Sequence, residues 1–373
     1  MKLLVIQPWF SAIGHPAQSL VNMASAIGRD ERVDYLVSSG GDSEYFREAT
    51  ERLSEWGEVE SYAVTTPVGE SNTVRALWAL WRMRLKGRQY QRILFFDESL
   101  YVLALLWPLF SLLLPVERIG VLHLFGPNLG GGRKNRWTRF IIGRFLRRPE
   151  VRLYLRTEEL VEAWLDAYKE AAGRIRISTL PSLEIPDGPV YQHELEATDQ
   201  VRFGVIGQIR IGKGIEWLVP AFQNETHLGK LTVAGEFNMP QTREQLSVLR
   251  EFGGFINRFM SENDMLELAA GQHYLLMLYD VWDKRMESAV LYLAARVSRP
   301  VIVYGDSWCG RMVSEFGCGL VAPIDREETV DMLRRAPRPG SAEYAKLLMG
   351  MDAFRQAHSV NSLRGKVMQE LLG

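Results

Sequence analysis

Two cations stand in a glycine-rich turn in the second half of the chain. The segment FGVIGQIRIGKGIEWLVPAF, residues 203–222, places Arg210 and Lys213 between an apolar strand pattern and a helical pattern. Glycine lets the backbone approach an anion closely, and a helix N-terminus adds free N–H groups and partial positive charge. This combination suits a diphosphate. The alternative is an ordinary strand–helix turn whose cations are solvated.

A second candidate anion site begins at Ser288. This serine is expected to cap the helix AVLYLAAR, so that the backbone amides of Ser288, Ala289 and Val290 lie in its first turn. Amides there could stabilise the negative charge that grows on a leaving phosphate during sugar transfer. Glu287 beside them could accept hydrogen bonds from sugar hydroxyls, or it could be a carboxylate favoured by the helix dipole.

The first half of the chain offers fewer candidates. Gly14 and His15 follow the first apolar run, in a loop that could line a cleft. His123 ends another strand pattern and could polarise an acceptor, or it could be a satisfied buried histidine. The sequence has no Asp-x-Asp motif and no Cys/His cluster with zinc spacing, so we expect no metal.

These residues sit within a regular alternation of strand and helix patterns. The strand candidates are residues 2–7, 33–38, 93–97, 119–124, 151–155, 175–178, 201–206, 230–234, 274–279, 300–304 and 319–322. The helix candidates are residues 16–28, 71–85, 157–171, 215–222, 262–270 and 288–296. Continuous apolar strands separated by helices predict parallel sheets covered on both faces.

The pattern restarts near residue 201. We therefore expect an α/β protein with two Rossmann-like, doubly wound domains facing across a cleft. The predicted division is an N-terminal domain of residues 1–185, a linker of residues 186–200 rich in Pro and acidic residues, and a C-terminal domain of residues 201–340. Residues 341–373 form a helical segment expected to return to the N-terminal domain.

The order of motifs over residues 201–330 resembles the donor-binding domain of GT-B glycosyltransferases, most closely the retaining, GT4-like type. The resemblance is carried by Gly207-Gln208-Ile209 with Lys213-Gly214, by Pro300-Val301-Ile302, and by Gly317-Cys318-Gly319-Leu320-Val321. It implies a metal-independent glycosyltransferase without a cofactor that moves a sugar from a nucleotide-diphosphate sugar to a glycan, a glycolipid or another acceptor.

The resemblance also implies roles for individual residues. Arg210, Lys213, Ser288, Ala289 and Val290 would bind the donor diphosphate, and Gly207, Gln208, Arg258 and Phe259 would bind the donor nucleotide. His123 and Glu287 would be catalytic, and Gly14 and His15 would form the acceptor loop.

The chain departs from this family at three positions. Gln208 stands where an arginine is usual, and Arg285 and Leu293 stand where the family has two glutamates. These departures fit an alternative hypothesis, a catalytically silent GT-B-like subunit that acts as a binding or partner protein.

Overall composition limits the partners. The 373 residues carry 44 basic and 45 acidic side chains, a net charge of −1, which does not favour nucleic acid. The first apolar run is too short for a signal peptide and predicts a cytoplasmic protein. Residues 100–116 form an uncharged run of 17 residues with Pro108 inside it. We expect a buried helix here, with burial in a membrane surface as the alternative.

A basic, amphipathic segment covers residues 133–148. It contains seven cations and no acid, with Trp137, Phe140 and Ile141 at helical spacing. This pattern is typical of a helix that lies on an anionic membrane surface. It would favour a lipid-linked acceptor and a location at the inner face of the membrane. Alternatively, the apolar stripe packs inward.

Overall fold

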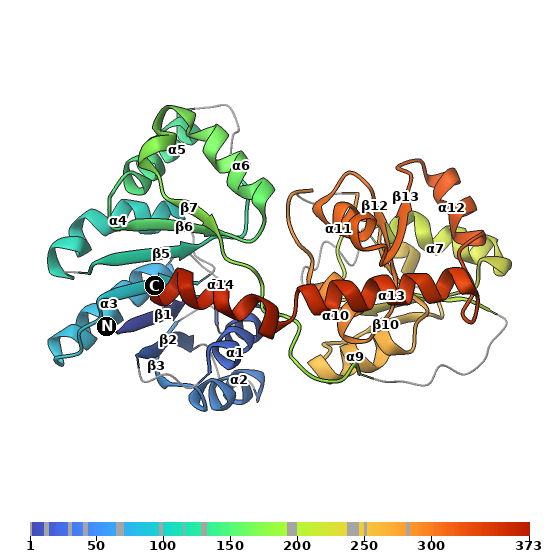
Figure 1. Cartoon of the computed structure of the whole chain (residues 1–373), viewed down its shortest axis with the longest axis horizontal. Coiled ribbons are helices and arrows are strands. Elements are labelled where there is room, and N and C mark those ends of the chain that lie inside the picture. The colour runs from blue at the N-terminus through green and yellow to red at the C-terminus, as the bar shows by residue number, and fades with distance from the viewer. Residues whose placement is uncertain are drawn as a thin grey trace. The chain divides into compact units, whose positions relative to one another are not determined.

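The computed structural model describes residues 2–10, 15–28, 32–39, 44–64, 71–96, 100–114, 116–127, 133–191, 200–236, 246–249, 252–280 and 284–373. Contacts between residues divide the chain into two compact units (Figure 1). The first unit is Met1–Glu184 together with Leu363–Gly373, and the second unit is Ile185–Ser362.

The first unit is built on a parallel sheet. Within the described residues the strands follow the order β3-β2-β1-β4-β5-β6-β7. Their bounds are β1 (Leu3–Gln7), β2 (Val33–Ser39), β3 (Glu58–Ala63), β4 (Arg92–Phe95), β5 (Arg118–Leu122), β6 (Val151–Leu155) and β7 (Ile177–Thr179). Strand β1 is fully buried at the centre, as expected for a sheet covered on both faces.

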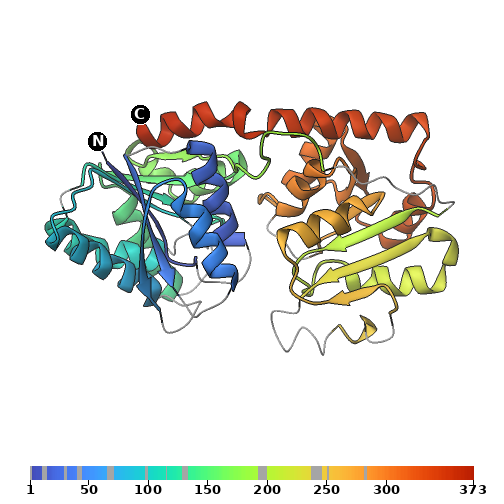
Figure 2. The ribbon, with the colours of Figure 1, turned by 90° about the horizontal axis from the view of Figure 1, so that it is seen from below.

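Helices cover both faces of this sheet (Figure 2). They are α1 (His15–Ile27), α2 (Glu44–Ser54), α3 (Ser71–Leu85), α4 (Leu100–Leu113), α5 (Arg133–Leu146), α6 (Glu158–Ala167), the short 3₁₀ helix η1 (Lys169–Arg174) and the end of α14 (Val360–Leu372). Strand order reverses direction between β1 and β4, so right-handed crossovers put α1 and α2 on one face and α3 to α6 on the other.

The second unit repeats the design. Its parallel sheet has the order β10-β9-β8-β11-β12-β13 among the described strands. The strands are β8 (Arg202–Ile206), β9 (Lys230–Gly235), β10 (Phe255–Asn257), β11 (Tyr274–Met277), β12 (Val301–Tyr304) and β13 (Gly319–Ala322). The helices are α7 (Ile215–Asn224), α9 (Glu262–Ala270), α10 (Ala289–Arg296), α11 (Trp308–Phe316), α12 (Arg326–Arg334) and α13 (Ala342–Ala357), with 3₁₀ turns η2 (Thr226–Leu228) and η3 (Ser247–Leu249).

Two apolar clusters form the core of the second unit. Phe203 and Trp217 belong to the cluster that packs α7 on the sheet. Leu275 and Phe354 belong to the other, which packs α10 and α13. These clusters on the second sheet, and the helices on both faces of the first, confirm the α/β, doubly wound fold class expected from the sequence.

Residues 341–373 divide between the two units. Helix α13 lies in the second unit, and Leu363–Gly373 lies in the first. There the buried guanidinium of Arg92 donates to the carbonyl oxygens of Leu371 at 3.0 Å and of Gly373 at 3.1 Å. The hydroxyl of Tyr154 donates to the carbonyl of Glu370 at 3.1 Å. The carbonyls at the end of α14 are thus satisfied by side chains from the sheet.

Every strand that the sequence predicts overlaps an observed strand, whereas several elements, β3, β10, α2 and α11 among them, have no counterpart in the prediction. Strand β3 reads EVESYA and is half-exposed at the sheet edge, so it lacks the apolar run of a central strand. The expectation that the apolar run after residue 100 forms a buried helix is wrong for one side of α4. Leu109 and Leu112 are exposed there, because the sheet covers the opposite side of the helix.

Among the described residues, no helix has the length and apolar character needed to cross a membrane.

Candidate functional site

The donor-site candidates of the second unit gather where its strand order reverses. Strands β8 and β11 are neighbours, while the chain passes from β8 outward to β9 before returning to β11. Ligands of doubly wound sheets bind at such a switch point, beyond the carboxyl ends of the strands. The glycine turn after β8 and Tyr279 after β11 both lie at this end of the sheet.

Glycine is required at two positions where the loops after β8 and β9 meet. Gly207 has φ 97° and donates its N–H to the carbonyl of Ala234 at 2.9 Å. Gly235 has φ 151°, and a Cβ atom there would lie 2.0 Å from the carbonyl oxygen of Gly207. The loops after β8 and β9 therefore approach more closely than any side chain would allow.

Lys213 is buried inside the turn. Its side chain is 6% exposed, and its Nζ donates to the carbonyl of Ile206 at 3.3 Å and lies 5.9 Å from the ring centre of Tyr279. Burial, and then the charge of Arg210, lowers the pKa of Lys213 from its ordinary value of 10.5 to about 7. No carboxylate in the described part of the chain lies within ion-pair distance of this ammonium.

Arg210 adds a second positive charge to the same turn. Its side chain is half-buried, and burial lowers the pKa of the guanidinium, an effect that Tyr279 opposes. Two desolvated cations in one loop create a strong positive potential, which favours an anionic ligand. The sequence prediction paired these two residues, and the structure brings both beside Tyr279.

One backbone N–H group just before α7 is already hydrogen-bonded to a side chain of the same helix. Glu216 accepts the backbone N–H of Gly212 at 2.8 Å. Gly214 caps the helix with φ 74°, and a Cβ atom there would meet the carbonyl of Leu278 at 2.5 Å. The sequence pattern did not single out Glu216. Because this carboxylate takes one N–H of the turn, the two cations carry most of the attraction for an anion.

Ser288 and Tyr279 connect the turn to α10. The Ser288 side chain is buried and accepts the N–H of Val290 at 3.4 Å, as the predicted helix cap. The hydroxyl of Tyr279 lies 3.4 Å from Oγ of Ser288, and burial raises the pKa of Tyr279 to about 12. The sequence analysis did not single out Tyr279, which lies beside two of the candidate residues. Ala289, also a predicted diphosphate contact, is exposed in the first turn of α10.

Glu287 lies just before the N-cap of α10 and is hydrogen-bonded to that helix. Its Oε2 accepts the hydroxyl of Tyr292 at 2.7 Å. Arg258, a predicted nucleotide contact, makes a bidentate pair with Asp264, with both N–O distances 2.9 Å. This pairing lowers the pKa of Asp264 and offsets the charge of Arg258. Gln208 and Phe259, the other predicted nucleotide contacts with side chains, are exposed.

The first unit contains fewer of the predicted site residues than the second. His123 follows β5 and is half-buried, with its ring edge-on to Trp164 at 5.6 Å and to Phe125 at 5.9 Å between centres. Trp164 donates its indole N–H to the carbonyl of Phe125 at 3.0 Å, which fixes this aromatic group. Gly14 lies outside the described residues. His15 is the first residue of α1, and its side chain is not among those described.

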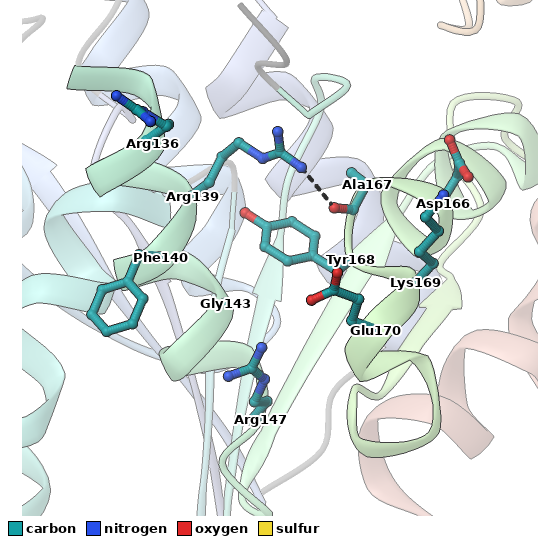
Figure 3. A pocket seen from close by; sticks show the side chains of 10 residues that line it. All are labelled: Arg136, Arg139, Phe140, Gly143, Arg147, Asp166, Ala167, Tyr168, Lys169 and Glu170. Atoms are coloured by element: carbon teal, nitrogen blue, oxygen red, sulfur yellow. Dashed lines mark hydrogen bonds between the residues drawn. The ribbon is translucent and has the colours of Figure 1, made fainter. Parts of the chain in front are cut away.

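A cavity of about 550 Å³ lies between α5 and the end of α6 (Figure 3). Residues of both signs line it: Arg136, Arg139, Phe140, Gly143, Arg147, Asp166, Ala167, Tyr168, Lys169 and Glu170. Arg139 donates to the carbonyl of Ala167 at 3.0 Å, and Tyr168 stacks on Trp164 at 5.8 Å. Trp164 therefore touches both the His123 ring and the wall of this basic cavity.

Thiol and metal chemistry have little support in the described ranges. Burial raises the pKa values of Cys309 and Cys318 to about 12, so both thiols stay protonated at neutral pH. The described residues contain no group of three His, Cys, Asp or Glu side chains that could hold a metal ion.

No protein-family model matches the sequence, and no curated protein matches it. Solved structures with the same fold do match. HepE of Anabaena in complex with UDP-glucose superposes with a TM-score of 0.70 at 11% identity, covering 100% of both chains. The trehalose-6-phosphate synthase OtsA gives 0.68 at 13% identity, covering 100% of this chain and 99% of that one. The sucrose-phosphate synthase of Thermosynechococcus elongatus gives 0.68 at 12% identity, with the same coverage.

At such low sequence identity, the similarity to these solved structures establishes the fold of this chain. The chain has the GT-B architecture, with two Rossmann-like units that match these structures along their whole length.

Proposed function

We propose that this protein transfers a sugar from a nucleotide-diphosphate sugar to an acceptor. The observation that carries the proposal is the buried ammonium of Lys213, which has no carboxylate partner among the described residues and shares its loop with Arg210. A buried charge is costly unless it is paired. A diphosphate at the switch point of the second sheet would supply the missing negative charge.

The same cations would assist the reaction. When the bond between the anomeric carbon and the diphosphate oxygen breaks, the electron pair stays on the diphosphate and its negative charge grows. Lys213 and Arg210, fixed in place before the reaction, would stabilise this charge more than the ground state. In this scheme the cations act without a metal ion or a cofactor, as the sequence resemblance implies, and the outcome at the anomeric carbon would be retention.

A uridine nucleotide is the donor to test first. HepE, whose fold this chain shares, was solved with UDP-glucose bound. We propose that Gly207, Gln208, Arg258 and Phe259 contact the nucleotide, because Gly207 leaves the approach to the turn open and the exposed Phe259 ring offers a surface for a base. Glu287, oriented by Tyr292, would accept hydrogen bonds from the donor sugar. Catalytic roles for His123 and Glu287 stay predictions.

One observation favours the silent-subunit alternative. Leu293, at a position where the resembling family has a glutamate, is a buried apolar residue of α10. The second glutamate position is Arg285. A protein that kept the diphosphate site but lost these carboxylates would bind a nucleotide sugar without turning it over.

Binding and turnover separate the two functions. We expect calorimetry to detect UDP or UDP-glucose binding to wild type, and Lys213→Met and Arg210→Gln each to weaken it about 100-fold. Lys346→Met, an exposed lysine of α13, is the matched control and should bind like wild type. Release of UDP from UDP-glucose, unaffected by EDTA, would identify an enzyme. Binding without release of any sugar from UDP-, GDP- and ADP-sugars would favour the silent subunit, and absence of nucleotide binding would refute both.

We further propose that the acceptor is a glycan or a lipid-linked molecule reached at the inner face of a membrane. The support is the basic segment of residues 133–148, whose Trp137 and Phe140 are exposed on α5. The cavity beside α5, lined by three arginines, could hold a phosphorylated part of such an acceptor.

A further inference from the structure

Three neighbouring helices of the first unit expose large apolar side chains. Helix α4 packs against α3 on one side and against α5 on the other, all on one face of the sheet (Figures 1 and 2). The exposed apolar residues are Val74, Trp78 and Leu85 on α3, Leu105, Leu109, Leu112 and Leu113 on α4, and Trp137 and Phe140 on α5. We call this surface the three-helix face.

The middle of the three-helix face is uncharged and mostly apolar. Helix α4 contains no charged residue, and it buries Leu103 and Trp107 against the rest of the unit. On its other side Leu109 is 62% exposed and Leu112 is 81% exposed. Several large apolar side chains exposed on neighbouring helices indicate an interaction site on a folded protein.

The charged side chains on these three helices all have one sign. Helices α3, α4 and α5 contain no aspartate and no glutamate. Within the described part of the chain, Arg82 and Arg84 of α3 and Arg136 and Arg144 of α5 have no carboxylate partner. Arg147, directly after α5, has none there either. Lys86, Arg88 and Arg148, by contrast, form ion pairs with Glu60, Glu58 and Glu150.

We propose that the three-helix face binds the surface of an anionic lipid bilayer. The leucines of α4 and the aromatic rings of α3 and α5 would enter the interfacial region, and the arginines on either side would contact headgroup phosphates. Exposed apolar side chains flanked by cations are the features that hold a helix in the plane of a membrane. The inference extends the contact proposed for residues 133–148 to α3 and α4, and it does not depend on sugar transfer.

Charge decides between a bilayer and a second copy of this chain. Two copies meeting through this face would bring the same arginines toward each other without an acid to balance them. An anionic bilayer offers complementary charge to both basic edges at once. Arg136 and Arg147 also line the cavity beside α5, where a headgroup phosphate can be held by more than one guanidinium.

Vesicle co-sedimentation without any nucleotide tests the proposal. We expect wild type to sediment with vesicles of phosphatidylglycerol and phosphatidylcholine, and to release at high salt or with phosphatidylcholine alone. Replacing Arg136, Arg144 and Arg147 together with glutamine should weaken partition about 100-fold. Leu109→Asn with Leu112→Asn should weaken it about tenfold or more, because less apolar surface enters the interface.

Met349→Asn is the matched control, since Met349 is 73% exposed on α13 in the second unit and should not change partition. Circular dichroism and thermal unfolding establish that each variant is folded. Absence of wild-type binding to anionic vesicles at low salt would overturn the proposal. So would equal loss of binding in Met349→Asn. Dimerisation in solution that the two leucine substitutions abolish, without vesicle binding, would assign the face to a second copy instead.

Discussion

The Nζ atom of Lys213 lies 5.9 Å from the centre of the Tyr279 ring, inside the second unit. Tyr279 also approaches Ser288 through its hydroxyl at 3.4 Å. One aromatic side chain thus joins the glycine turn after β8 to the first turn of α10. The contact positions the two groups that the sequence suggested separately for binding a diphosphate.

Lys213→Met is expected to make the protein more stable and to weaken nucleotide binding about 100-fold. Methionine keeps much of the lysine's length and removes a charge that burial disfavours, so the free energy of unfolding at neutral pH should rise by about 1–3 kcal/mol. Thermal unfolding without ligand checks this, with Lys346→Met as the surface control. A variant less stable than wild type would show that the ammonium contributes to the fold rather than to a ligand.

Affinity for UDP-glucose should fall as the pH rises above about 7. The pKa of Lys213 in the free protein is about 7, so above this pH its side chain is mostly a neutral amine, which must take up a proton when the diphosphate binds. Affinity should weaken by about tenfold per pH unit until the pKa of the bound form is reached. Calorimetry between about pH 6 and about pH 9 measures this. A flat profile for wild type would contradict the prediction, and Lys213→Met should give one.

The lowered pKa of Lys213 also makes folding stability depend on pH, but stability should rise with pH where nucleotide affinity falls. The folded-state pKa of Lys213 is about 7 and its ordinary value is 10.5, so between these values the unfolded chain binds more protons than the folded one. Stability should therefore rise with pH across this window. The difference in unfolding free energy between wild type and Lys213→Met, followed by urea titration at several pH values, isolates the contribution. It should shrink as the pH increases, and a growing difference would refute the assignment.

Two glycine substitutions should change stability in opposite directions. In Gly235→Ala the new Cβ would meet the carbonyl oxygen of Gly207 at 2.0 Å, at a φ of 151°. We expect a loss of more than about 2 kcal/mol and weaker nucleotide binding, because the turn must open. In Gly365→Ala, inside α14, nothing lies within 4 Å of the new atom. A gain of about 0.5–1 kcal/mol is expected there. Urea unfolding measures both, and equal effects would contradict the geometry.

Arg92→Gln should destabilise the first unit. The guanidinium of Arg92 satisfies two carbonyls at the end of α14, and burial lowers its pKa, so it has little access to water. Losing these bonds leaves the carbonyl of the buried Leu371 unpaired, which we expect to cost about 1–3 kcal/mol. Arg326→Gln, an exposed arginine of the second unit, is the control. Similar unfolding midpoints for the two variants would show that water replaces the Arg92 hydrogen bonds to the carbonyls of Leu371 and Gly373.

Local patterns were sufficient to predict the central strands of both sheets and the glycine turn after β8. Central parallel strands are apolar runs, and Gly207, Gly212 and Gly214 mark a turn that L-residues with side chains disfavour. Tyr279 carries no such mark, because an aromatic residue after a strand is common and its contact with Lys213 depends on the β8–β11 pairing. The sequence also does not indicate which side of α4 is exposed to solvent. A helix that is apolar all round gives no period from which its buried side can be read.

The return of Leu363–Gly373 to the first unit has a consequence for biosynthesis. The sheet of that unit is complete in sequence by residue 179, yet the segment that Arg92 and Tyr154 hold comes after the second unit in the chain. While the second unit is being translated, the Arg92 and Tyr154 side chains of the nascent first unit therefore lack these hydrogen-bond acceptors. Chaperones that bind early during translation would have this interval in which to act.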